Sequence, residues 1–207
     1  MFFILIVLLV MTSSDHEPIS AAIENYKNLQ SYSVTLRSRN NDSSEEIKYY
    51  YKKPGFIRME FIRPHKGAVL VYNPLRKEVR LRPFGFFKSF VLTLSPDNKL
   101  IKSSRGHTVD ESDIGALLKM VKKLQSNGKT DIIGDESVNG KTTSVTSVEG
   151  EGDFAVEGIH RYVLWFDKKT FLPLKVSAYD LKGGLIEEVL MDDLEINSEI
   201  KDSFFEF

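Results

Sequence analysis

Short runs of alternating apolar and polar residues, separated by turn signals, most restrict what this chain can fold into. In residues 32–37, Tyr32, Val34 and Leu36 alternate with polar side chains, as in a strand with one buried face. Because short turns separate most of these runs, neighbouring strands are expected to pair antiparallel. Strands are predicted over residues 32–37, 47–52, 56–61, 68–72, 77–82, 131–138, 142–148, 159–167, 171–179 and 185–191.

Two segments have helical periodicity instead. Residues 18–29 repeat apolar side chains at helical spacing after Pro18, which suits a first helical turn. Residues 114–124 carry an apolar stripe, and Asp110 or Ser112 is the expected N-cap. So few helices exclude repeated βαβ units. The sequence therefore predicts an α+β fold, a strongly curved antiparallel sheet forming an incomplete β-barrel, with two or three helices as a lid or plug.

The first ten residues are all apolar, which is the core length of a signal peptide and too short to cross a bilayer. Small polar residues follow at positions 12–14, so we expect a signal peptide over 1–14 and a single domain over 15–207. No basic residue precedes the apolar run. The true start could therefore lie upstream, and the alternative interpretation is a core strand.

The sequence contains no cysteine, which excludes disulfides, cysteine-ligated zinc and a lipidated cysteine anchor. Its 28 basic and 29 acidic residues give a net charge of −1, so the basic excess typical of a nucleic-acid-binding protein is missing. An exported protein of this kind must be held together by its sheet and its core alone.

Motifs for catalysis or cofactor binding are not found. The four histidines form no close metal-binding pair, and there is no glycine-rich phosphate loop, so no metal site and no cofactor are expected. Adjacent carboxylates occur at residues 45–46, 187–188 and 192–193, but neighbours on a strand point to opposite faces. We interpret them as solvated charge, and we do not expect an enzyme. The histidines are His16, His65, His107 and His160.

Aromatic and large apolar residues on the predicted strands are candidates for the lining of a ligand cavity. A curved sheet covered by helices can enclose apolar space, although such residues are also ordinary core. Residues 83–92 are the most aromatic stretch and fit a strand nearly as well as a helix, and residues 84–90 within it would suit a flap over the cavity mouth. The candidate ligand-binding residues are Tyr49, Tyr51, Met59, Phe61, Tyr72, Phe84, Phe87, Phe90 and Trp165.

Two segments resemble the outer-membrane lipoprotein carriers of the LolA-like family. One is YYYKKPGFIRMEFIRPHKGAVLVY over residues 49–72, a strand ending in a basic residue before proline, an aromatic strand, a turn and an apolar strand. The other is RYVLWFDKKTFLPLKV over residues 161–176, which resembles a hairpin of LolA/LolB-like sorting proteins. The resemblance is diffuse but covers most of residues 18–207.

The resemblance implies an incomplete β-barrel, lidded by helices, whose interior takes the acyl chains of lipoproteins. It also implies an inner-membrane exporter and an outer-membrane acceptor as partners. In that family a basic residue before proline latches the lid by donating to lid carbonyls, and the matching residue is Lys53. Arg58 matches an arginine of more distant members, with an outward-facing strand residue as the alternative.

The expected function is that of a monomeric periplasmic carrier that shuttles acylated lipoproteins or lipids. Two alternatives stay open at this point. One is an envelope sensor or regulatory lipid-binding module on the same fold, and the other is a small-ligand enzyme with its site in the barrel mouth.

Overall fold

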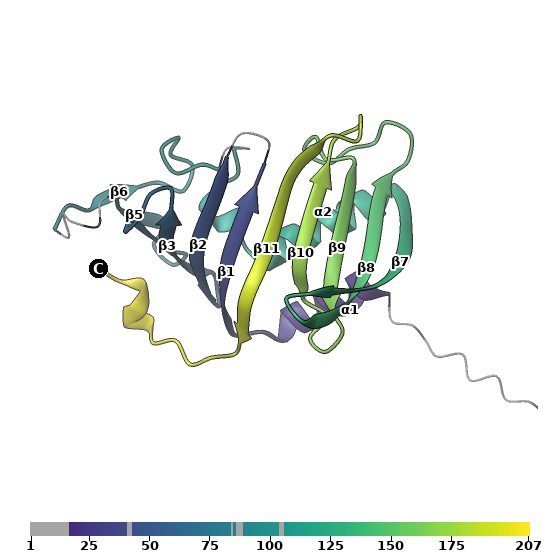
Figure 1. The fold of residues 1–207 in the computed structure, drawn as a ribbon. Coiled ribbons are helices and arrows are strands. Elements are labelled where there is room, and N and C mark those ends of the chain that lie inside the picture. The colour runs from purple at the N-terminus through teal and green to yellow at the C-terminus, as the bar shows by residue number, and fades with distance from the viewer. Residues whose placement is uncertain (1–16, 41–42, 84, 86–88, 104–105) are drawn as a thin grey trace, which may run out of the picture.

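The computed structural model describes residues 17–40, 43–83, 85, 89–103 and 106–207, so the expected signal peptide lies outside the described residues. Within them the chain forms one antiparallel sheet of eleven strands (Figure 1). The strands are β1 (Ser31–Arg39), β2 (Ser44–Lys52), β3 (Phe56–Arg63), β4 (Val69–Asn73), β5 (Glu78–Arg82), β6 (Leu92–Leu94), β7 (Gly128–Val138), β8 (Lys141–Gly150), β9 (Arg161–Asp167), β10 (Pro173–Tyr179) and β11 (Leu185–Ile196).

The strand order is β6-β5-β4-β3-β2-β1-β11-β10-β9-β8-β7, and the sheet is curved but not closed. The predicted antiparallel, open, barrel-like sheet is therefore confirmed. Two meanders, β1–β6 and β7–β11, meet where the first and the last strand pair. The sequence pattern of residues 83–92 does not distinguish a helix from a strand, and strand β6 begins at the last of these residues.

Two α-helices occupy the same face of this sheet. Helix α1 (Pro18–Asn28) precedes β1, and helix α2 (Ile114–Gln125) lies on the connection from β6 to β7, which links the two free edges of the sheet. A further turn of 3₁₀-helix, η1 (Val109–Glu111), precedes α2, and a second one, η2 (Asp202–Phe205), lies near the C-terminus. None of the helices in the described part of the chain is both long and apolar enough to cross a membrane.

The cap of α2 differs from the expectation. Its N-cap is Asp113, whose Oδ1 accepts from the backbone N–H of Ala116 at 2.7 Å. Of the expected caps, Asp110 lies within η1, and Ser112 ends η1 and directly precedes Asp113. A capping oxygen must belong to the last residue before the helix, and residues 109–111 form a separate 3₁₀ turn, so α2 starts later than the first capping candidate.

The main hydrophobic core lies between the helices and the concave face of the sheet. Side chains of α1 and α2 pack there against alternate residues of nine strands, which follows from the two-residue period of a strand. On β9, for example, Tyr162, Leu164 and Phe166 belong to this core. Each large apolar side chain buried in this way contributes about 1.5–3 kcal/mol.

The convex face carries two smaller clusters. One contains Trp165 and lies under the strands β7–β11. The other is formed by the C-terminal segment, which runs back across the first half of the sheet and buries Phe205 against Val69 and Val71 (Figure 1). This segment covers the face of β3–β5 that is opposite the helices.

Candidate functional site

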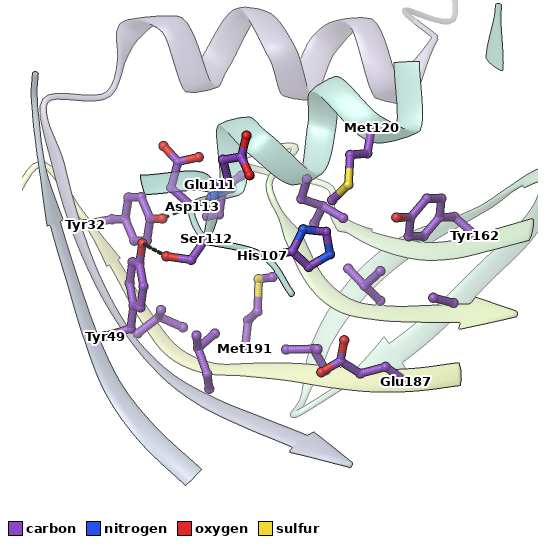
Figure 2. Close-up of a pocket in the computed structure, with 17 residues that line it drawn as sticks. Tyr32, Tyr49, His107, Glu111, Ser112, Asp113, Met120, Tyr162, Glu187 and Met191 are labelled. Carbon is purple, nitrogen blue, oxygen red and sulfur yellow. Dashed lines mark hydrogen bonds between the residues drawn. The ribbon is translucent and has the colours of Figure 1, made fainter. Parts of the chain in front are cut away.

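A cavity of about 510 Å³ lies between the concave sheet and the segment that leads into α2. A smaller cavity of about 190 Å³, drawn in Figure 2, adjoins it further under α2. The two share lining residues and form one continuous region. The shared residues are Leu36, Tyr49, His107, Ser112, Glu187 and Val189.

The larger cavity is mainly apolar. Its floor comes from alternate residues of β1–β5, because these point to the concave face. Its cover comes from Leu100, Ile101 and Val109, which lie in and just after the connection from β6 to η1. The apolar floor consists of Leu36, Ile47, Tyr49, Met59, Phe61, Ala68, Leu70 and Leu81.

Three of the candidate lining residues, Tyr49, Met59 and Phe61, line this cavity. Tyr51 and Tyr72 are buried in the neighbouring core instead, without lining either cavity. Since all five alternate on concave strands, the sequence pattern identifies the correct face but does not distinguish the cavity wall from packed core.

Most of the aromatic segment expected to form a flap lies outside the described residues, so that role stays a prediction. Phe84 and Phe87 lie outside the described residues, and Phe90 is 49% exposed and lines neither cavity. The described cover comes from Leu100, Ile101 and Val109, in a polar, turn-rich part of the sequence. It lacks the hydrophobic periodicity by which sequence reasoning finds an element, so it was missed.

Trp165 lies on the opposite face of the sheet from the cavity, so its assignment to the lining is corrected. It packs against Val145 and Leu174 in the convex cluster. Its Nε1–H donates to Glu136 at 2.8 Å, and the Lys175 ammonium lies 4.4 Å from its ring centroid. Strand β9 is apolar on both faces, and alternation alone does not say which face the helices cover.

A cluster of tyrosines from α1, β1 and β2 surrounds the start of α2. The Tyr32 hydroxyl accepts from the Ile114 N–H at 3.1 Å, and the Tyr49 hydroxyl lies 3.2 Å from Ser112 Oγ. Tyr26 donates to the carboxylate of Asp113. Burial raises the pKa of the Tyr32 and Tyr49 phenols well above the usual value. These bonds hold the first turn of α2 against the sheet beside the cavity.

Lys53, the expected lid latch, contacts a helix carbonyl. Its ammonium donates to the backbone oxygen of Lys27 at 2.5 Å, in the last turn of α1. That oxygen is one of the carbonyls left without an intrahelical partner at a helix C-terminus, where a cation is favourable. The contact ties the end of α1 to the turn between β2 and β3.

Arg58 has a different role from the expected latch. It lies on the convex face, donates to the Phe204 carbonyl at 2.9 Å, and stacks 4.6 Å from the centroid of the Phe204 ring. A 2.7 Å ion pair to Glu60 completes its contacts. The alternative interpretation, an outward-facing strand residue, is therefore correct, and Arg58 holds the C-terminal segment rather than the helices.

We expect replacement of Lys53 by methionine to loosen the end of α1. The methionine keeps the apolar stem but cannot donate to the Lys27 carbonyl, so amides in the last turn of α1 should exchange faster with deuterium. Hydrogen exchange read by mass spectrometry tests this. Lys48→Met, at an exposed position on β2, is the matched control. Equal exchange of these amides in both variants would show that Lys53 does not stabilise the end of α1.

Two carboxylates interpreted as solvated charge line the larger cavity. Glu45 is in phase with Ile47 and Tyr49 on β2, and Glu187 is in phase with Val189 on β11, so alternation contained the signal for both. The expectation that adjacent carboxylates point apart is correct, because Glu188 faces the other side and pairs with Lys175 at 2.9 Å. The interpretation as solvated charge is wrong for Glu45, Glu187 and Glu188.

Two histidines complete the polar part of the lining. His65, in the turn between β3 and β4, lines the larger cavity, and His107 lines both. Burial and the nearby Glu187 raise the pKa of the Glu45 carboxyl, while His65 acts in the opposite direction. No group of three or more His, Asp or Glu residues among those described is placed to hold a metal ion.

Comparison with solved structures shows the fold. The chain is similar to MucB in complex with MucA(peri), with 17% identity and a TM-score of 0.56, over 92% of this chain and 58% of that one. It is also similar to the lipoprotein LppX of Mycobacterium tuberculosis, with 11% identity and a TM-score of 0.55, over 89% and 95%. A weaker match, with 14% identity and a TM-score of 0.43 over 92% and 96%, is a LolA superfamily protein from Nitrosomonas europaea.

The open, curved antiparallel sheet with two helices on its concave face agrees with the incomplete β-barrel that the sequence resemblance implied. This chain spans less than two thirds of the MucB chain that it matches. The sequence matches none of the curated proteins with which it was compared. A family model described as "Protein of unknown function (DUF1571)" matches residues 24–207.

Proposed function

Since this chain belongs to the DUF1571 family, whose function is not known, we propose its function from its own cavity. It is an exported carrier that binds the acyl chains of a lipoprotein or lipid between the concave sheet and its helical cover. We further propose that residues 1–14 direct export to the periplasm, where an inner-membrane exporter would supply the cargo and an outer-membrane acceptor would receive it.

The observation that carries this proposal is the apolar cavity of about 510 Å³. Sites for small molecules have volumes of about 300–1,000 Å³ and are mostly apolar. Burial of each methylene group is worth about 0.8 kcal/mol, so ten methylenes would supply about 8 kcal/mol before the costs of ordering are subtracted. An acyl chain can therefore bind tightly with few polar contacts.

A regulatory module is the second candidate. The likeness to MucB, a protein crystallised in complex with MucA(peri), favours it, although at 17% identity this likeness concerns the fold alone. The carrier is placed first because the cavity belongs to this chain itself. None of the three neighbours reported above is named as an enzyme, which supports a binding function over catalysis.

Native mass spectrometry of the purified protein, followed by organic extraction, tests the proposal. We expect a co-purified lipid or acylated peptide, or uptake of an added fluorescent acyl probe by the apo protein. An apo mass combined with no uptake of the probe would mean that the aromatic interior excludes acyl chains, and would overturn the proposal.

Phe61→Glu is expected to abolish uptake of the acyl probe while circular dichroism shows an intact sheet. A carboxylate on the cavity floor costs several kcal/mol to desolvate against an apolar chain. Leu75→Glu adds the same charge at a residue that is 75% exposed and lies outside both cavities. Wild-type uptake by Phe61→Glu would show that Phe61 does not contact the ligand.

A further inference from the structure

The charged residues that line the two cavities are mostly acidic. Among the described residues, Glu45, Glu111, Asp113 and Glu187 contribute carboxylates and Lys102 contributes the one amine. Asp113 is already engaged, because it caps α2 and accepts from Tyr26. Glu45 and Glu187 lie on β2 and β11, which flank β1, near the turn between β1 and β2. A ligand chain on the apolar floor therefore ends beside two carboxylates.

His107 adds a hydrogen-bond acceptor at the junction of the two cavities (Figure 2). Its Nδ1 lies 3.4 Å from a carboxylate oxygen of Glu157, and this carboxylate favours the neutral tautomer with the proton on Nδ1. Nε2 is then a lone-pair acceptor. It is buried without a hydrogen-bond partner among the described residues, and a buried polar atom is normally paired. A ligand that satisfies it must bring a donor.

We propose that this cavity selects amphiphiles that carry a primary ammonium group beside their apolar chain. The inference rests on the proposed acyl-binding function and specifies the ligand class. An ammonium has three donors and no acceptor, which matches the carboxylates of Glu45 and Glu187 and the Nε2 of His107. A charge-assisted hydrogen bond in a poorly solvated site is worth more than a neutral one.

The same lining discriminates against the commonest competitors. A fatty-acid carboxylate or an exposed phosphate monoester would place a negative charge near Glu45 and Glu187, and like charges brought together in a cavity oppose binding. Among the described lining residues, Lys102 is the one amine that could compensate, and His65 and His107 are the other basic side chains. Selectivity thus arises from repulsion as well as from attraction.

Displacement of a neutral fluorescent apolar probe, N-phenyl-1-naphthylamine, tests the inference at pH 7.5. The competitors are hexadecylamine, hexadecanol and hexadecanoate, which share one chain length and are used below their micellar concentrations. We expect hexadecylamine to displace the probe at a concentration about tenfold below that of hexadecanol, and hexadecanoate to be the weakest. Equal displacement by all three, or strongest displacement by hexadecanoate, would overturn the inference.

The double variant Glu45→Gln/Glu187→Gln should lose the tenfold preference of the wild type for hexadecylamine over hexadecanol. Glu46→Gln/Glu195→Gln is the matched control, since it removes two carboxylates from the same strands at residues that line neither cavity. An amine preference retained in the cavity variant would overturn the inference.

Binding of hexadecanol shows whether a negative result concerns the ligand class alone or the proposed acyl-binding function as well. If neither hexadecanol nor the probe binds, the acyl-binding proposal fails as well. If both bind without an amine preference, the carrier proposal stands and only the ligand class is wrong.

Discussion

Gly150→Ala is expected to lower the free energy of unfolding by about 3 kcal/mol. An added Cβ at this position would lie 2.0 Å from the carbonyl oxygen of Phe154. That oxygen cannot withdraw freely, because it is backbone and lies 2.9 Å from the His160 ring nitrogen Nδ1. The backbone N–H of Gly150 also donates to the His160 carbonyl at 2.8 Å, so both sides of the clash are fixed.

Urea unfolding followed by circular dichroism measures this effect. Gly184→Ala is the matched control, since its added Cβ would approach side-chain atoms of Asp180, the nearest at 2.9 Å, and no backbone atom within 4 Å is among its three nearest neighbours. The control should lose less than about 1 kcal/mol. If Gly150→Ala is as stable as the wild type, the loop after β8 does not have the tight geometry described. The loop matters for the site because it carries Glu157, the partner of His107.

The protein is expected to lose about 4 kcal/mol of stability between pH 9 and pH 11 through three tyrosines. Burial raises the pKa of Tyr26, Tyr32 and Tyr49 above the unfolded value of about 10. The folded state therefore keeps three protons that the unfolded state releases. Stability is fully present below pH 10 and falls as the pH rises, by about 1.4 kcal/mol per tyrosine over this range.

Urea unfolding at pH 9, 10 and 11 measures this loss. Because lysines also titrate in this pH range, the variant Tyr49→Phe is used to isolate the contribution of one phenol. The variant should start less stable by about 1 kcal/mol, since the hydrogen bond between Tyr49 and Ser112 is lost. Between pH 9 and pH 11 it should then lose about 1.4 kcal/mol less stability than the wild type. Parallel pH curves for the two proteins would show that Tyr49 does not keep its proton.

The strands could be predicted from the sequence because a two-residue period is a local property of the chain. The side of each strand that meets the helices could not always be predicted. On β2 and β3 only one face is consistently apolar, so Tyr49 and Phe61 were placed correctly. On β9, Val163 and Trp165 are as apolar as their neighbours, and only the tertiary structure shows that they lie under the convex face.

The polar part of the cavity could be predicted only in part. Glu45 and Glu187 keep the phase of the apolar residues on their strands, a signal that was available and was interpreted as solvated charge. His107 lies in an aperiodic segment, and its place depends on the path of the chain between the two edges of the sheet. Its partner Glu157 is 50 residues away, so no local pattern connects them.

The position of β11 has a consequence for how the binding site comes into being. It is the last strand in the sequence and yet lies in the middle of the sheet, between β1 and β10. Before β11 pairs with β1, the two meanders of the sheet are not hydrogen-bonded to each other. The cavity then lacks the wall that contains Glu187, Val189 and Met191. Pairing of β1 with β11 closes a loop of about 150 residues. Contacts between residues so far apart in the sequence raise the contact order, and a high contact order slows folding. A chain synthesised from its N-terminus therefore completes this wall of the cavity only after β11 has been made.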